Sequence, residues 1–193
     1  MKNLKKLRRN FERFCYQNRS KGIPNLMLYI SIGTAIVYFL SMVDESNTLY
    51  YALSFDRDLI LQGQVWRLFT YVFTYNAGNI LIMLISMLCY FSLGRAMENI
   101  WGTFRFNLFY FTGVILMDVF CLLIGGIADV TYLNLSLFLA YATLFPDTHF
   151  MLFFIIPIRA WIFAVFDLAI TFYDVITLTF MGYFPFSLFP LVA

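Results

Sequence analysis

Apolar runs separated by short polar stretches occupy most of the chain after residue 24. Five of these runs are candidates for membrane-spanning helices, and they cover residues 25–43, 80–98, 104–124, 131–145 and 161–180. A helix needs about 20 apolar residues to cross the hydrocarbon core of a bilayer, and the fourth run is shorter than that. The pattern therefore predicts an all-α fold, a polytopic bundle of membrane helices.

A further apolar stretch follows the fifth run. Gly182, Pro185 and Pro190 indicate a turn and the start of a sixth helix, and the sequence stops at Ala193 while it is still apolar. We therefore expect six spans, the sixth incomplete in this chain. The alternative is five complete spans followed by a short apolar tail.

The first residues have a different pattern, with isolated apolar positions among basic ones. Leu4, Leu7, Phe11 and Phe14 recur at helical spacing, and basic residues fill many of the other positions. Such a pattern is typical of an amphipathic helix that lies on an anionic leaflet. The alternative is a solvated basic tail that acts only as a topology signal. The sequence Gly22-Ile23-Pro24 should end this helix before the first span.

Two connections are unusually apolar. Residues 44–78 contain so many aromatic and aliphatic side chains that we expect them to dip into the outer leaflet, with Trp66 and Tyr71 as anchors at the lipid–water boundary. Arg67 beside that surface should pair with a carboxylate or with helix-end carbonyls. The run 150–157 is too short to span and should lie in the interface or re-enter the bilayer.

Composition and charge support the membrane assignment and suggest an orientation. Hydrophobic residues make up 62% of the 193-residue chain and charged residues 12%, whereas soluble proteins are about half apolar and about a quarter charged. Residues 1–22 hold 8 of the 13 basic residues. Basic residues beside a first span favour the cytoplasmic side. We expect an integral protein of a prokaryotic plasma or inner membrane, with a cytoplasmic N-terminal segment, 1–22, and a transmembrane domain, 23–193.

No residue pattern predicts a cofactor or a metal site. Cys15, Cys89 and Cys121 are scattered and match neither a metal-binding spacing nor a disulfide framework. There is no phosphate-binding glycine loop, and the basic tail fits lipid better than nucleic acid. Membrane lipid is therefore the expected partner, with no nucleic acid, and the pattern predicts no oligomeric state.

Several short motifs flank the second and third runs. Residues 63–68 read GQVWRL, residues 94–98 read GRAME, and residues 101–106 read WGTFRF. In this order they resemble the Trp-Arg loop, the Gly-Arg-x-x-Glu motif and the Gly-x-x-Arg-Phe motif of the rhomboid superfamily, which includes the rhomboid intramembrane serine proteases and the derlins. Residues 144–146 and 153–161 are similar to the end of its serine-bearing helix and the following link. The resemblance covers about residues 20–180 and implies fold-defining roles for Trp66, Arg67, Gly94, Arg95, Glu98, Gly102 and Arg105.

The catalytic residues of active rhomboids have no counterpart at the matching positions. Those enzymes use a serine in Gly-x-Ser-Gly, a histidine, and a His-x-x-x-Asn pair that stabilises the oxyanion. The serine position falls on Tyr132 here, and the pair falls on Ile82 and Ser86. Ser136 lies one helical turn after Tyr132 and is a weak candidate nucleophile, while the single histidine, His149, is expected at the opposite end of the bundle.

Acidic residues within the spans suggest other chemistry. Asp167 and Asp174 are seven residues apart and share a helix face, and Asp118 lies in the third span. Acidic residues inside a membrane are energetically costly and often mark functional sites, so an aspartyl protease or a proton relay is one interpretation. The simpler one is hydrogen bonding to neighbouring Tyr, Thr or Ser, with Asp118 and Asp174 near the outer boundary and Asp167 deepest.

Taken together, the patterns and the resemblance predict a non-catalytic rhomboid-like protein, a pseudoprotease close to the derlins. It would bind transmembrane segments of client proteins or perturb the local bilayer. The first alternative is an intramembrane serine-type endopeptidase of the rhomboid family that carries out intramembrane proteolysis. The second is a small proton-coupled transporter that uses Asp167 and Asp174.

Overall fold

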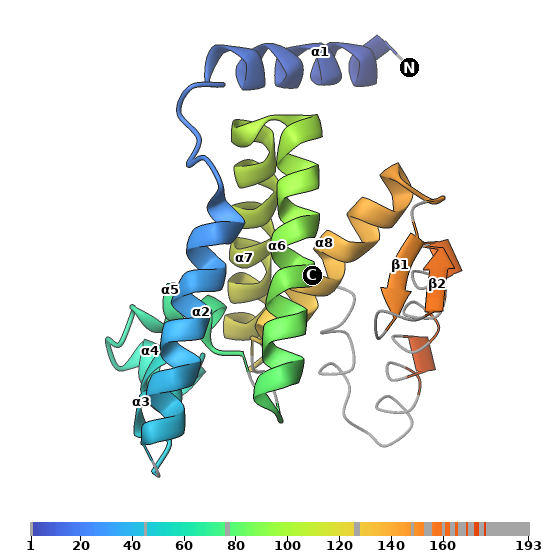
Figure 1. Ribbon diagram of the computed structural model, residues 1–193. Coiled ribbons are helices and arrows are strands. Elements are labelled where there is room, and N and C mark those ends of the chain that lie inside the picture. Colours follow the sequence, from blue (N-terminus) through green and yellow to red (C-terminus); the bar gives the residue numbers. More distant parts are fainter. Residues whose placement is uncertain are drawn as a thin grey trace.

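A computed structural model describes residues 2–44, 46–75, 78–125, 128–147, 149–152 and 156–159, together with the single positions 161, 162, 165, 169, 172, 173 and 176. Helices dominate this part of the chain, and one small β-hairpin follows them (Figure 1). The elements are α1 (Lys2–Gln17), α2 (Leu26–Val43), α3 (Thr48–Leu53), α4 (Arg57–Leu61), α5 (Arg67–Thr70), η1 (Tyr71–Phe73), α6 (Ile80–Trp101), α7 (Thr103–Ile124), α8 (Val130–Leu144), β1 (His149–Leu152) and β2 (Ile156–Arg159).

Three of the described helices, α2, α6 and α7, are long and apolar enough to cross a membrane. Large apolar side chains point outward from them, including Ile36 on α2, Leu88 on α6 and Ile115 on α7, each more than half exposed. Such an exterior suits contact with lipid. The first three predicted spans are therefore confirmed, with bounds within a few residues of those expected.

The fourth helix, α8, is shorter than a complete span. Its 15 residues extend about 22 Å, against about 30 Å for the hydrocarbon core of a bilayer. Figure 1 shows it running at an angle to α6 and α7. Most of the expected fifth span and all of the expected sixth lie outside the described residues.

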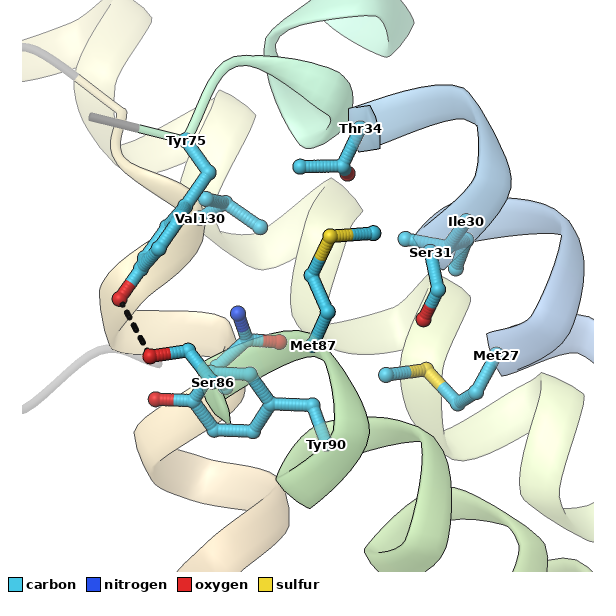
Figure 2. A pocket seen from close by; sticks show the side chains of 10 residues that line it. Met27, Ile30, Ser31, Thr34, Tyr75, Ser86, Met87, Tyr90 and Val130 are labelled. Carbon is cyan, nitrogen blue, oxygen red and sulfur yellow. Dashed lines mark hydrogen bonds between the residues drawn. The ribbon is translucent and has the colours of Figure 1, made fainter. Parts of the chain in front are cut away.

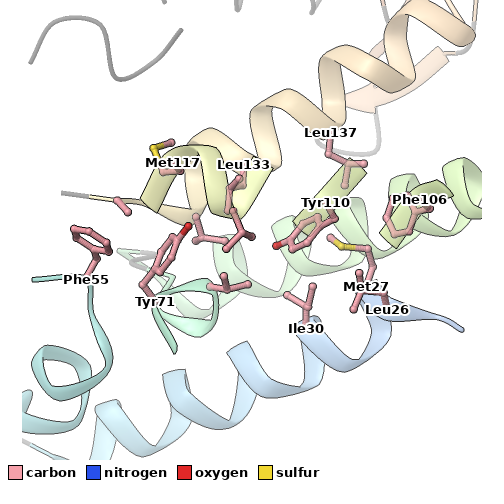
Figure 3. Close-up of a cluster of buried hydrophobic side chains, with 14 of the residues drawn as sticks. Leu26, Met27, Ile30, Phe55, Tyr71, Phe106, Tyr110, Met117, Leu133 and Leu137 are labelled. Atoms are coloured by element: carbon pink, nitrogen blue, oxygen red, sulfur yellow. The ribbon is translucent and has the colours of Figure 1, made fainter. Parts of the chain in front are cut away.

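The core forms where α2, α6, α7 and α8 meet, and glycines allow the helices to approach closely. α2 packs on α6, α6 packs on α7, and α8 contacts both α6 and α7. A Cβ atom at Gly94 would overlap the side chain of Met27 on α2, and one at Gly113 would lie 3.1 Å from Leu133 on α8. Figure 3 shows buried side chains from several of these elements, including Phe106 and Leu137, in a single cluster.

The amphipathic N-terminal helix is present, and α1 lies across one end of the bundle (Figure 1). The ring of Phe14 packs edge-on against that of Phe104 at the start of α7, with centroids 5.7 Å apart. Cys15 is buried. The α1 helix is thus docked on the α6–α7 turn by aromatic packing.

The described part of the connection between α2 and α6 lies at the opposite end of the bundle from α1 (Figure 1). It folds into α3, α4, α5 and η1, and η1 packs on α2 and α8. Tyr71 is completely buried, with its ring edge-on to Phe55 at 5.8 Å. Tyr71 is therefore a core residue, and the expectation that it anchors the loop at the lipid–water boundary is wrong.

The segment after α8 contains two paired strands, which the sequence pattern did not predict. Residues 149–152 pair antiparallel with residues 156–159, with Phe150 opposite Ile158. The expectation that residues 150–157 lie in the interface or re-enter the bilayer stays a prediction, because the pairing of these strands does not give their depth in the membrane. A hairpin satisfies backbone hydrogen bonds between its own strands, which a lone extended segment beside lipid does not, and its Phe and Ile residues favour strands.

Candidate functional site

A small cavity lies between α2, α6 and α8, inside the membrane-spanning part of the bundle (Figure 2). Its volume is about 20 Å³, enough for one water molecule. The residues that line it come from those three helices and from the segment after η1. They are Met27, Ile30, Ser31, Thr34, Tyr75, Ser86, Met87, Tyr90, Val130 and Asn134.

Neutral polar groups concentrate in this cavity. The hydroxyls of Tyr75 and Ser86 are 3.1 Å apart and hydrogen-bonded (Figure 2). Thr34 on α2 and Asn134 on α8 are both buried. None of the ten lining residues is a histidine, a lysine or a carboxylate. The cavity can therefore hydrogen-bond a water molecule or a backbone group, but the lining residues that the structure describes include no general base to activate a nucleophile.

The three positions that match the lost catalytic residues occupy different surroundings. Ser86 lines the cavity, where its hydroxyl is engaged with Tyr75. Ile82, one turn earlier on α6, is 54% exposed and carries no polar side-chain atom. Tyr132 is half-buried on α8 and is not among the lining residues. The structure brings Ser86 alone of the three to the cavity.

The weak candidate residues do not form a catalytic pair within the described part of the chain. The Ser136 hydroxyl donates to the Leu133 carbonyl of its own helix at 2.9 Å. His149 begins β1, after the end of α8. Asp167 and Asp174 lie outside the described residues.

Asp118 is buried on α7 beside Tyr71 from η1. Neither Asp118 Oδ1 nor the Tyr71 hydroxyl has a hydrogen-bond partner among the described residues. This pair lies on the α3–α5 side of the bundle, away from α1, because η1 belongs to that end (Figure 1). Asp118 does not line the α2–α6–α8 cavity.

Arg67 is a second polar centre, and its position in the sequence motif is explained by its contacts. The side chain is buried, with 5% exposure. One terminal nitrogen donates to the carbonyls of Tyr51 and Ser54 at 2.5 and 2.7 Å, and Nε donates to Gln64 Oε1 at 2.9 Å. Helix-end carbonyls are thus its partners, the second of the two kinds that the sequence suggested.

Trp66 and Thr70, close to Arg67 in the sequence, bind the two carbonyls between those of Tyr51 and Ser54. Trp66 Nε1 donates to Ala52 O at 3.3 Å, and the Thr70 hydroxyl donates to Leu53 O at 2.7 Å. Four successive carbonyls at the end of α3 are therefore satisfied by side chains from residues 66–70. Carbonyls at the end of a helix have no partner within that helix, so this segment caps α3 and fixes the loop.

Glu98 joins three helices at the end of the bundle near α1. Its Oε1 accepts from the backbone N–H of Asn25 at 3.0 Å and from the Thr103 hydroxyl at 2.9 Å. Among the described residues, no ion pair joins Glu98 to Arg95 or Arg105. The backbone N–H groups at the start of α2 lack intrahelical acceptors, and a carboxylate also complements the positive end of that helix.

The tight turn between α6 and α7 depends on Gly102. Its φ is +82°, a backbone conformation that favours glycine. Arg95 on α6 lies over the ring of Phe91, 6.0 Å from its centroid. Arg105 faces α1 across a separate hollow.

Two positioning residues were missed by sequence reasoning. Arg57 on α4 donates from Nε to the Leu122 carbonyl at 2.9 Å, which ties the loop to the end of α7. Asn107, buried on α7, donates to the Ile23 carbonyl at 3.1 Å. A polar side chain within an apolar span was the available signal for Asn107, whereas Arg57 has no distinctive local pattern.

The chain matches a known protein family. Residues 62–184, well over half of the chain, match the model of the Rhomboid domain family. No curated protein matches the chain. No solved structure matches it. The matched range begins just before the Trp66-Arg67 segment and includes α6, α7 and α8.

Proposed function

This chain belongs to the rhomboid family, and from that membership we propose that it is a catalytically inactive, derlin-like member that binds transmembrane segments of client proteins and perturbs the bilayer around them. The observation that supports the inactive assignment is the lining of the α2–α6–α8 cavity, whose described residues offer hydroxyl and amide groups and no base. Peptide hydrolysis by a serine needs a base to take its proton and donors for the oxyanion.

The surface of α6 supports the binding of clients. Leu81, Leu84, Ile85 and Leu88 recur at three- and four-residue spacing, and all are exposed. They form an apolar stripe on the same helix that contributes Ser86 and Met87 to the cavity. A client helix on this stripe would lie beside hydroxyl groups, and hydrogen bonds between helices in a membrane contribute about 0.6–2 kcal/mol each.

The length of α8 supports a perturbed bilayer. A helix of about 22 Å next to full-length spans creates hydrophobic mismatch, to which the surrounding lipid responds by thinning. Thinner lipid lowers the cost of placing a polar or short client helix at this side of the bundle.

Site-specific photo-crosslinking tests client binding. A photoreactive residue in place of Leu88 should trap membrane proteins in intact cells, while the same probe in place of Ile115 on α7, which is similarly exposed, should trap few. Equal labelling from both positions would show passive lipid-phase collisions and would contradict a client surface on α6.

A proteolysis assay tests the inactive assignment. The purified chain should not cleave a reporter membrane substrate, and Ser136→Ala or Ser86→Ala should change nothing. Cleavage by the wild-type chain that disappears in one of these variants would establish a serine-type endopeptidase instead.

Ion-dependent uptake that is lost in Asp167→Asn would favour the transporter alternative.

A further inference from the structure

A second hollow, separate from the cavity in the bundle, lies between α1 and the start of α7. It is open to the surface and has a volume of about 530 Å³, within the range of about 300–1,000 Å³ typical of small-molecule sites. The lining comes from two segments nearly ninety positions apart in the sequence. The residues are Arg9, Glu12, Arg13, Tyr16, Gln17 and Arg105.

The α1 residues of this hollow lie on one face of the helix. Positions 9, 13 and 16 or 17 are separated by three or four residues, the spacing that brings side chains to the same side of a helix. Arg105 is the third residue of α7 and lies across from them. The arrangement therefore exists only because α1 folds back over the α6–α7 turn.

Positive charge is in excess in the hollow. Three arginines face a single acidic residue, Glu12. Within the described part of the chain, no ion pair or hydrogen bond involves the side chain of Arg9, Arg13 or Arg105. Three guanidinium groups gathered in one place repel one another, and an anion between them would remove that cost. Guanidinium groups bind phosphate oxygens in paired, charge-assisted hydrogen bonds.

The hollow is held open by packing on either side of it. Phe14 and Phe104 are adjacent in sequence to Arg13 and Arg105, and the contact between their rings fixes the distance of α1 from the start of α7. Gly22 also lies against Thr103 and Phe104, so that a Cβ atom there would be 2.8 Å from the Thr103 side chain. The arginines are thus presented by docked elements rather than by a free tail.

The position of the hollow matches the level of lipid headgroups. Arg105 lies two residues inside the start of a membrane-spanning helix, and α1 runs across the end of that helix (Figure 1). Phe11 and Phe14 on α1 are half exposed, as apolar side chains of a helix in the membrane interface are. A ligand held here can keep its acyl chains in the bilayer beside the bundle.

We propose that Arg9, Arg13 and Arg105 form a binding site for a phosphate group, supplied by the headgroup of an anionic phospholipid. The site differs from general attraction of a basic tail to a charged surface, because it requires an arginine of the transmembrane domain. It is independent of client binding at α6.

Calorimetric titration of the purified full chain in zwitterionic detergent tests the site. Dioctanoyl phosphatidylglycerol should bind saturably, and dioctanoyl phosphatidylcholine should not. Arg105→Gln should weaken the binding of phosphatidylglycerol about fivefold. The matched control is Arg95→Gln, which removes the same charge from the same end of the bundle but lies outside the hollow, and it should leave binding unchanged.

A second pair of variants separates the site from the charge of α1. Arg9→Gln combined with Arg13→Gln should weaken binding more than Lys5→Gln combined with Lys6→Gln, because the lysines do not line the hollow. Equal losses within either matched pair, or equal binding of the two lipids, would reveal diffuse electrostatic attraction and overturn the proposal. Absence of saturable binding would overturn it as well.

Inorganic phosphate at constant ionic strength distinguishes the two sources of the ligand. If phosphate binds in the absence of lipid with the same dependence on Arg105, the site takes a soluble phosphate. If phosphatidylglycerol binds and phosphate does not, the headgroup in its membrane setting is the ligand.

Discussion

Arg67 is a buried, charged side chain whose hydrogen-bond partners are backbone carbonyls and a neutral amide. Its Nε donates to Gln64 and one terminal nitrogen donates to two helix-end carbonyls, and these bonds replace hydrogen bonds to water that burial removes. Those carbonyls would otherwise be unsatisfied at the end of α3. The residue is therefore a positioning residue for the whole α3–α5 loop.

Replacing this arginine should destabilise the protein. Arg67→Met leaves the carbonyls of Tyr51 and Ser54 without their donor, and a buried group that loses its partner costs about 1–3 kcal/mol. Thermal unfolding in detergent should show a clear decrease in Tm. Arg95→Met, at an exposed position, is the control, and equal Tm values for the two variants would contradict the capping role.

Gly94 is required by the distance between two helices. Gly94→Ala should force α2 and α6 apart because its methyl group overlaps Met27, with an expected loss of about 1–3 kcal/mol. Met27→Ala in the same chain should recover part of the loss, which a double-mutant cycle would measure. Gly78→Ala, where the added Cβ meets no atom within 4 Å, serves as the control. A loss that Met27→Ala does not reduce would place the strain elsewhere.

The ends of the helices decide how the elements join. Glu98 on α6 is hydrogen-bonded to the starts of α2 and α7, and Arg57 on α4 is hydrogen-bonded to the end of α7. At the end of α2, Asp44 accepts hydrogen bonds from the Ser46 hydroxyl and from the N–H of Leu49. Each junction is a polar side chain that satisfies backbone or hydroxyl groups of another segment or of the adjoining turn.

The Asp44 junction should open in acid. Hydrogen bonds from the Ser46 side chain, and then from the Leu49 backbone, hold the pKa of the Asp44 carboxyl below its usual value of 3.8. Because the pKa of Asp44 is lower in the folded state than in the unfolded state, the Asp44 carboxylate stabilises the fold above pH 3.8. This stabilisation is lost as the pH falls through the folded-state pKa.

Amide hydrogen exchange at residues 46–49 should therefore lose protection as the pH falls below 3.8 and Asp44 becomes protonated. Asp44→Asn should exchange faster at neutral pH and show little further change on acidification. Protection that is independent of pH in the wild-type chain would rule out this role for the carboxylate.

At the scale of the whole molecule, the bundle is uneven in thickness. α6 and α7 have 22 residues each, whereas α8 has 15. The short helix contacts both long ones, and under the proposed function the lipid beside it would adjust to its lower hydrophobic height. This asymmetry is the feature that links the fold to the proposed effect on the bilayer.

Bilayer thickness should therefore affect stability. The Tm of the chain in nanodiscs of dimyristoyl phosphatidylcholine should exceed that in dierucoyl phosphatidylcholine, because the thinner lipid reduces the mismatch around α8. Equal Tm values, or a higher Tm in the thicker lipid, would contradict a thinning role for α8.

The sequence by itself determined the three long spans and the amphipathic α1, because local hydropathy and its periodicity decide whether a segment enters lipid or lies on its surface. It also indicated that Trp66, Arg67, Gly94, Glu98 and Gly102 are special, through motifs that resemble the rhomboid superfamily. It did not predict that the segment after the fourth span pairs into a hairpin.

Only the tertiary structure decided which groups these residues contact. Glu98 lies 73 positions after Asn25, whose backbone N–H donates to it, and Arg105 lines the same hollow as Arg9 and Arg13 only because α1 folds back on α7. The polar cavity likewise combines Thr34, Ser86 and Asn134 from three helices. Such contacts depend on how the helices pack against one another, and neither the hydropathy of one segment nor the spacing within it contains that information.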